Sequence, residues 1–366
     1  MTPDVNAHLH TPYSFSCFDS IGQALDMASA EGVKVVGIND FYSTEGYGEW
    51  DAECRKRSLF PLFNIEMIAL SEPRQSAGIR VNDPNNPGRT YLSGKGLKYP
   101  VILSGKQAAE LAAVKAESNA QVERMCLKLN AHLDSVKAGF NLSYPEILST
   151  LCRGSVRERH LAKALRLAVD ERFKGEDRLD FYFRVFGGNA LKAEPENVAA
   201  VENEIRSRLL KAGGAAFVPE DPKAFLPVET VQDIITAAGG IPTYPFLADD
   251  AKGNFTDFER DLPKCVDDLK KMGIRSVEFI TTRNTTAVLE SYSSYLEAEG
   301  FIVSFGSEHN SPSLEPVKLR TRDASGLSEK LREVNYRGAC AIAAHQSGEQ
   351  GIEAGDRIIQ KAISNG

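Results

Sequence analysis

The stretch DVNAHLHTPYS, residues 4–14, sets the expectation for the fold. Its first seven residues read as a short strand, in which His8 and His10 are separated by one residue. Because side chains alternate along a strand with a period of two, both imidazoles should point to the same side. Two histidines at the carboxyl end of a first strand supply half of a metal site. Such a pair also arises by chance, so its meaning depends on the later strands.

Three later apolar runs end in, or contain, potential metal ligands. They span residues 33–40, 59–70 and 301–309. The polar residues in question are Asp40, Glu66, Glu308 and His309. A carboxylate within a buried run needs a partner, and a metal ion is one possibility. Since strand ends of a βα barrel meet at one rim, these residues predict a divalent metal site there.

Strands and helices alternate near both ends of the chain. Helices are expected at residues 20–32, 230–238, 263–272 and 286–298, and further strands at 241–246 and 276–283. This alternation implies a parallel sheet, either closed as a barrel or open. Residues 71–100 read instead as a long loop with a short strand near residues 90–92.

The middle of the chain has a different character. Residues 104–212 are helical in pattern and rich in charge, with no strand of comparable strength. We therefore expect a first half-barrel at 1–103, a helical insertion at 104–235, and a second half-barrel with a C-terminal helix at 236–366.

Composition narrows the class of partner. The 366 residues carry a net charge of −7, which argues against an extended nucleic-acid surface. A membrane helix needs an apolar run of about 18 residues, and no run here is that long. The first residues also lack the pattern of a secretory signal. The six cysteines are scattered. Reduced thiols in a cytoplasmic protein are therefore expected.

The motifs, taken in order, resemble the PHP (polymerase and histidinol phosphatase) family of metal-dependent phosphoesterases. Residues 8–14 resemble its opening HxHxxYS element, and Glu66 fits its third-strand glutamate. Further similar segments are RERHLA at 157–162, AAGGIPTYP at 237–245 and FGSEH at 305–309. The resemblance implies a distorted TIM-like (βα)7 barrel, here with a helical insertion, and a metal cluster at its rim.

The departures from the family pattern are also informative. Three family histidines are missing: Phe41, Tyr91 or a neighbour, and Tyr244 stand at their positions, and Glu308 replaces an aspartate. The family uses three metals. Here the resemblance leaves one well-formed set of ligands: His8, His10, Glu66 and Glu308. We expect about one ion of Zn, Mn or Fe per chain.

The resemblance also suggests roles for nearby residues. Arg159 and His160 would bind substrate phosphate, and Tyr244 would line the substrate pocket. His309 would act as general acid. Asp40, the other catalytic candidate, would orient His10, bind the metal directly or cap the next segment, and the orienting role is favoured. The remaining histidines, His132 and His345, are expected to lie outside the site.

The expected function is hydrolysis of a small phosphorylated metabolite by a metal-dependent phosphoesterase. One alternative is a catalytically weakened PHP-like protein that serves as a binding or structural module. Another is different chemistry at the same rim, such as C–N hydrolysis or sugar isomerisation.

Overall fold

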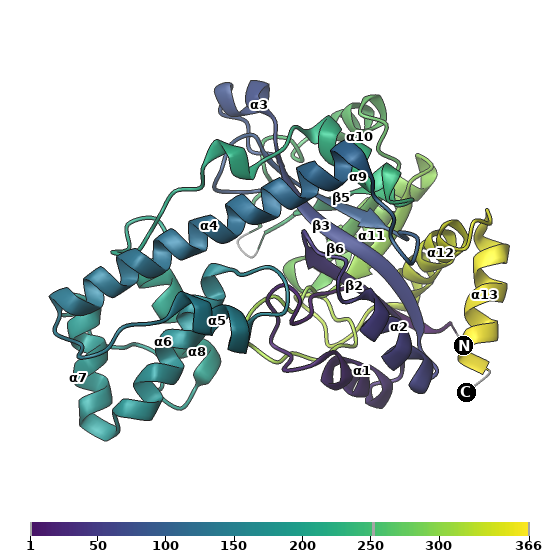
Figure 1. Ribbon diagram of the computed structural model, residues 1–366. Helices are drawn as coiled ribbons and strands as arrows, with labels where there is room; N and C mark the ends of the chain where they lie inside the picture. Colours follow the sequence, from purple (N-terminus) through teal and green to yellow (C-terminus); the bar gives the residue numbers. More distant parts are fainter. Residues whose placement is uncertain (1, 251–252, 365–366) are drawn as a thin grey trace.

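The computed structural model describes residues 2–250 and 253–364, and a sheet of seven strands lies at its centre (Figure 1). The strands are β1 (Asp4–Leu9), β2 (Val33–Phe41), β3 (Phe60–Leu70), β4 (Arg89–Lys95), β5 (Ile241–Phe246), β6 (Ser276–Ile280) and β7 (Ile302–Gly306). They are ordered β1 to β7, and a parallel bridge between Leu9 and Glu308 brings the two edges together. The sheet is thus a nearly closed, TIM-like barrel, as expected.

Strand β4 departs from the expected parallel arrangement. It pairs antiparallel with both β3 and β5, whereas all other neighbouring strands are parallel. The connection from β3 to β4, residues 71–88, contains only the short helix α3 (Glu72–Ser76) and folds back on itself, with the backbone N–H of Ser71 donating to the carbonyl of Gly88. As a result, β4 enters at the rim and descends toward the floor.

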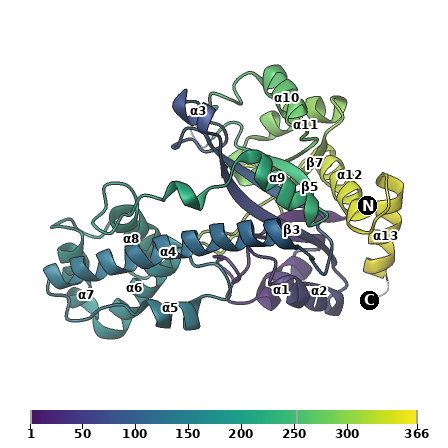
Figure 2. The same ribbon diagram turned by 45° about the horizontal axis from the view of Figure 1, so that its top comes forward.

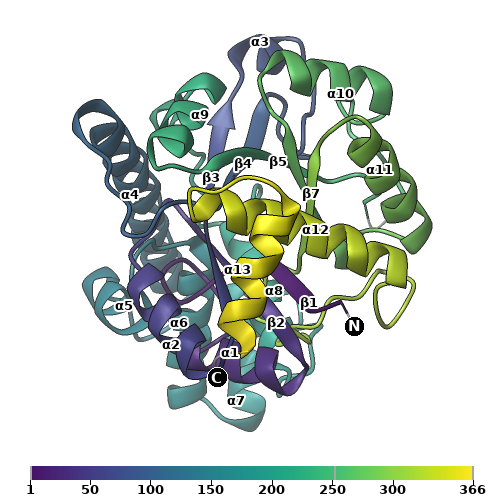
Figure 3. The same cartoon turned by 90° about the vertical axis from the view of Figure 1, so that its right-hand side faces the viewer.

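Helices cover the outside of the barrel and its amino-terminal end. Around the barrel lie α1 (Ile21–Ala30), α2 (Tyr47–Lys56), α9 (Val228–Ala237), α10 (Leu262–Lys271) and α11 (Thr286–Ala298), with short 3₁₀ turns at Pro222–Ala224 and Thr281–Arg283. Helices α12 (Glu329–Gln346) and α13 (Ile352–Ser364) lie across one end (Figure 3). Ala339 and Ile342 of α12 pack there on Val5, Val35 and Phe60. The opposite end, formed by the carboxyl ends of the parallel strands, is left for a site.

A group of helices projects from this open end (Figures 1 and 2). It comprises α4 (Gly105–Ser135), α5 (Tyr144–Leu151), α6 (Glu158–Arg172), α7 (Gly175–Val185), α8 (Val198–Ile205) and a π-helical turn at Arg206–Leu210. We call these helices the insertion. They surround their own hydrophobic cluster, which includes Leu129, Leu165 and Phe181.

Helix α4 joins the two cores. Val114 near its start belongs to the barrel core, whereas Val122 and Leu133 belong to the core of the insertion. With 31 residues, the helix is about 46 Å long at 1.5 Å per residue. Within the described residues, no helix is both long and apolar enough to cross a membrane.

Candidate metal centre

Three potential ligands, two from the end of β1 and one from the middle of β3, converge inside the barrel. Nε2 of His8 lies 3.2 Å from Nε2 of His10, and both nitrogens lie near Oε2 of Glu66, at 3.7 Å and 3.1 Å. The three side chains are buried, and their ligand atoms all lie within 4.8 Å of one another. This spacing suits three donors around one cation.

Glu66 comes from the middle of β3, where its neighbours are Phe41 of β2 and Ser93 of β4. Its Oε2 is buried and has no hydrogen-bond partner among residues 2–250 and 253–364. Burial, reinforced by the charge of Glu278, raises the pKa of Glu66 to about 8. A buried oxygen without a partner is costly, so this atom is suited to receive a ligand.

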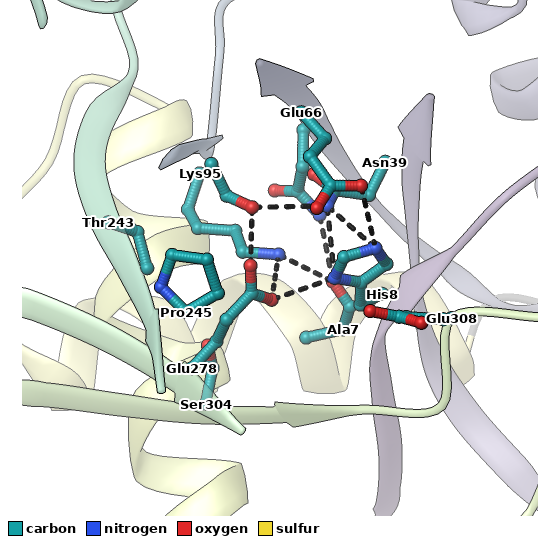
Figure 4. Close-up of polar contacts among 12 residues, drawn as sticks. Ala7, His8, Asn39, Glu66, Lys95, Thr243, Pro245, Glu278, Ser304 and Glu308 are labelled. Atoms are coloured by element: carbon teal, nitrogen blue, oxygen red, sulfur yellow. Dashed lines mark hydrogen bonds and ion pairs between the residues drawn. The ribbon is translucent and has the colours of Figure 1, made fainter. Parts of the chain in front are cut away.

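His8 is oriented by a buried ion pair. Its Nδ1 lies 3.0 Å from Oε2 of Glu278, and the same oxygen lies 2.6 Å from Nζ of Lys95. Figure 4 shows these three side chains meeting inside the barrel. Because an ionised carboxylate only accepts hydrogen bonds, Nδ1 of His8 carries the proton and Nε2 keeps its lone pair. The amide of Asn39 lies 2.9 Å from Nε2 and would have to turn aside for a metal.

His10 is oriented through a hydroxyl group. Its Nδ1 lies 3.1 Å from Oγ of Ser14, which itself donates to Asp40 at 2.6 Å. Since the hydroxyl proton is used on Asp40, Ser14 accepts from Nδ1–H of His10. Asp40 also accepts from the backbone N–H and the hydroxyl of Thr11. Asp40 therefore acts on His10 from a distance, and Nε2 of His10 is free as a ligand.

Burial keeps both imidazoles neutral. It lowers the pKa of His8 to about 3, against the opposing pull of Glu278, and also lowers the pKa of His10. Both tautomers direct a bare Nε2 toward the same point. Two such lone pairs 3.2 Å apart repel unless a proton or a cation lies between them. The donor set of two imidazoles and one carboxylate therefore fits a divalent ion of the Zn, Mn or Fe type.

Glu308 lies beside His8 (Figure 4) but outside the three-residue group. Its Oε2 accepts a hydrogen bond from Arg283 at 2.6 Å. Its backbone bonds to both sides of the histidine pair, since its N–H donates to the carbonyl of His8 and its carbonyl accepts from His10. Glu308 and His309 both have positive φ, 67° and 58°. In this arrangement Glu308 closes the barrel and pairs with Arg283.

His309 faces away from the convergence point. Its ring stacks on Phe18 with centroids 4.9 Å apart, and its two nitrogens lie 2.7 Å from Oγ of Ser307 and 2.9 Å from the carbonyl of Glu315. Both nitrogens are thus occupied by protein atoms. The expected role as general acid does not fit this position, because His309 turns the corner after β7 with a left-handed backbone.

A cavity of about 950 Å³ lies above the three ligands, between the barrel rim and the insertion. Its wall carries both acidic and basic side chains, together with several aromatic rings. Lining residues from the barrel include Phe41, Glu66, Tyr91, Arg283 and Glu308, and those from the insertion include Arg157, Glu158, Arg159, Arg206 and Lys211. Of the metal-binding candidates, Glu66 and Glu308 therefore face the cavity directly.

Two arginines of this wall lack a carboxylate partner. Within the described part of the chain, neither Arg157 nor Arg159 has an acidic group within 4.0 Å; they donate instead to Ser118 and Asn203. Arg157 lies over the ring of Phe41, 4.7 Å from its centroid. Burial and nearby Arg206 lower the pKa of Arg159 to about 10, so it remains cationic at neutral pH. Most of their donors stay available for an anion.

His160, the neighbour of Arg159, has a structural position. Its Nδ1 accepts from the backbone N–H of Arg157 at 2.9 Å and so caps the first turn of α6. Its ring meets Phe15 edge-on, and burial lowers its pKa to about 4. The expected contact of His160 with substrate phosphate does not fit this arrangement.

Tyr244 also lies elsewhere than expected. Its hydroxyl donates to Glu259 at 2.8 Å, and its ring is buried in the core outside the barrel, against Phe246 and Phe258. The neighbouring Thr243 and Pro245 face the interior instead (Figure 4). Because strand side chains alternate, a motif alignment that is one residue out of register selects the wrong face.

Five functional candidates were missed in the sequence: Arg157 and Arg283 in the cavity wall, and Ser93, Lys95 and Glu278 inside the barrel. Ser93 and Lys95 follow Tyr91 on one face of β4, which descends the barrel from rim to floor. The signal was the alternation Tyr91, Ser93, Lys95 in a segment that otherwise reads as a loop. Glu278 is the one charge inside the apolar run 276–280, the same signal that singled out Glu66.

Comparison with known proteins supports the fold. No protein-family model matches the sequence, and no curated protein does either. Among solved structures, a candidate metal-dependent phosphoesterase from Bifidobacterium adolescentis superposes with a TM-score of 0.57 at 16% identity, covering 91% of this chain and 96% of its own. An amidohydrolase from Chromobacterium violaceum, solved with sulfate and no metal, gives 0.57 at 16% identity over 90% and 95%. These similarities extend over the barrel and the insertion together.

Proposed function

We propose that this protein is a metal-dependent hydrolase, and specifically a phosphoesterase that acts on a small phosphorylated molecule with one metal per chain. The observation that carries the proposal is the convergence of Nε2 of His8, Nε2 of His10 and the unpartnered Oε2 of Glu66 beneath a cation-bearing cavity. The neighbours named as a phosphoesterase and an amidohydrolase support the same general class.

The three ligands would hold the ion, and the protein fixes their geometry in advance. A bound divalent ion would supply Lewis acidity and lower the pKa of a water molecule. Glu278 keeps the proton of His8 on Nδ1, and Asp40 does the same for His10 through Ser14. Both imidazoles therefore present a lone pair without rearrangement.

The cavity wall supports an anionic substrate. Arg157 and Arg159 at the start of α6 hold guanidinium groups that form no ion pair within 4.0 Å among the described residues. Arginine matches phosphate oxygens with paired donors, and the first turn of a helix favours a negative charge. These two residues would bind substrate phosphate oxygens while Arg283, held by Glu308, closes the other side.

The size of the site supports a small molecule rather than a polymer. The cavity of about 950 Å³ lies within the range of small-ligand sites. The insertion roofs the rim of the barrel, and the protein carries a net charge of −7. Neither feature favours an extended nucleic acid.

The test combines metal reconstitution with a substrate panel. Metal-free protein would be reloaded separately with Zn, Mn or Fe and assayed on phosphate monoesters and on amides. We expect about one ion per chain, activity on phosphate esters, and loss of both in Glu66→Gln. The matched control is Glu72→Gln, on an exposed helix far from the histidines.

Each other outcome points elsewhere. Metal-dependent cleavage of amides alone would favour C–N hydrolysis. Metal binding without turnover of any ester or amide would favour a weakened protein that serves as a binding module. Three ions per chain, or activity that survives Glu66→Gln, would overturn the proposal.

A further inference from the structure

A lysine is completely buried inside the barrel, directly below the candidate metal ligands. Nζ of Lys95 lies 2.6 Å from Oε2 of Glu278 and 3.2 Å from the carbonyl oxygen of Ala7. Both charged side chains are 0% exposed. An ammonium group this deep is expensive to desolvate, and its partner has to offset that cost.

The pair does more than compensate its own charges. The carboxylate of Glu278 also accepts from Ser93 and from Nδ1 of His8. Burial opposes the ionisation of Glu278, but Lys95 and His8 outweigh it and lower its pKa. The ion pair therefore connects directly to a ligand of the proposed metal.

The groups around the ammonium would otherwise resemble a second cation site. Two oxygen groups contact the ammonium directly, the carboxylate of Glu278 and the carbonyl of Ala7, and the hydroxyl of Ser93 donates to the other oxygen of the same carboxylate. The amide of Asn39 lies 3.2 Å from that hydroxyl, and its Oδ1 is buried without a hydrogen-bond partner in the described chain. Oxygen-rich surroundings of this kind suit a hard divalent cation such as Mn²⁺.

We infer that Lys95 is a built-in second cation: its ammonium group occupies this oxygen-lined position, fixes Glu278 behind His8, and restricts the centre to a single metal. The inference rests on the proposed function, since it presumes a metal at His8, His10 and Glu66. Lys95 acts through Glu278 and His8, which makes it a positioning residue. A fixed positive charge at this point repels a second ion and withholds Glu278 from coordination.

The experiment counts manganese ions. Wild-type protein and Lys95→Ala would be titrated with Mn²⁺, and the bound metal would be measured after desalting. Electron paramagnetic resonance would show whether the bound ions are magnetically coupled. We expect one ion and an isolated Mn²⁺ spectrum in the wild type. Lys95→Ala should bind two ions and give a spin-coupled spectrum. The double variant Lys95→Ala/Glu278→Gln should return to one ion, because the freed carboxylate is gone.

The outcomes separate the two proposals. If wild-type protein binds neither Mn²⁺ nor, in the reconstitution described above, Zn²⁺ or Fe²⁺, the proposed function fails. If the wild type binds one ion and folded Lys95→Ala also binds only one, with unchanged affinity, the inference about Lys95 is overturned while the metal site stands. Circular dichroism would verify folding of each variant.

A second variant covers the case in which Lys95→Ala does not fold. Replacing both partners, as Lys95→Met/Glu278→Met, removes the buried charges together, a change that proteins often tolerate. This variant should still bind one ion, but about 10–100-fold more weakly, because His8 loses the group that fixes its tautomer. Unchanged affinity would overturn the positioning role of the pair.

Discussion

The barrel and the insertion both contribute charged groups to one cavity, but they hold them differently. In the barrel, His8 and His10 are each tied to a carboxylate, directly or through Ser14. In the insertion, Arg157 and Arg159 lie in the wall with polar but uncharged partners. In the proposed function, the barrel thus supplies a rigid set of metal ligands, and the insertion supplies positive charge for an anionic substrate.

This difference indicates a division of labour. Buried histidines whose tautomers are fixed by hydrogen bonds are suited to bind a metal in one geometry. Guanidinium groups that stack on Phe41 and Phe15, yet keep free donors, are suited to recognise a substrate that comes and goes. Changes in the barrel should therefore affect metal binding, and changes in the insertion should affect substrate binding.

The largest effect should come from Glu66→Gln. The metal-free protein should keep its melting temperature, because Glu66, with a pKa of about 8, is already neutral below that pH. Metal affinity should fall by more than the about 10–100-fold typical of residues that only orient a ligand. Calorimetric titration and the metal-induced rise in melting temperature would measure this. An unchanged rise would contradict the assignment of Glu66.

Removing the arginines should have the next largest effect, and on substrate rather than metal. In Arg157→Met and Arg159→Met, loss of a charged hydrogen bond worth about 1.5–3 kcal/mol should lower kcat/KM by about 10–100-fold. Metal affinity should not change. Arg55→Met is the matched control, since Arg55 is exposed on α2 and pairs with Asp51 one turn away. Equal losses of metal affinity would contradict the division between barrel and insertion.

A change of one pH unit should alter metal affinity less than either of these substitutions alters its own target. The pKa of Glu66 is raised to about 8, mainly by burial, and its proton must leave when a metal binds. The apparent association constant should therefore rise about tenfold per pH unit and level off above pH 8. His8, with a pKa of about 3, adds nothing in this range. A metal-buffered titration that is flat below pH 8 would refute the effect.

The smallest effect on activity is expected from Tyr244→Phe. The hydroxyl of Tyr244 contacts Glu259 outside the barrel, so kcat/KM should stay at the wild-type value. The free energy of unfolding should fall by about 1–3 kcal/mol, because a buried carboxylate loses a donor. Urea unfolding would measure the latter. A large loss of activity without loss of stability would indicate that Tyr244 belongs to the substrate site after all.

Much of the barrel was predictable because its strands and helices have strong periodic patterns. The strand at 241–246 and the helix at 286–298 were expected at their observed bounds. The strand expected at 276–283 ends at Ile280, where Thr281–Arg283 turn into a 3₁₀ helix. The direction of β4 was not predictable, because strand orientation depends on how the long loop before it folds.

The candidate site was predictable only in part. The convergence of His8, His10 and Glu66 was predictable, because the sequence shows the period-two spacing of the histidines and the single charge in an apolar run. The partners that orient them are ordinary residues until the barrel closes: Lys95 and Glu278 are 183 positions apart and meet only across its interior. Sequence alone carries no sign of such a meeting.

Helix α4 has a mechanical consequence for the cavity. Because one unbroken rod carries Val114 in one core and Val122 in the other, the roof cannot swing open at a hinge within this helix without breaking its backbone hydrogen bonds. The spacing between the barrel and the insertion is therefore held by a stiff strut on the side of α4, which limits how far the cavity between them can widen for a larger molecule.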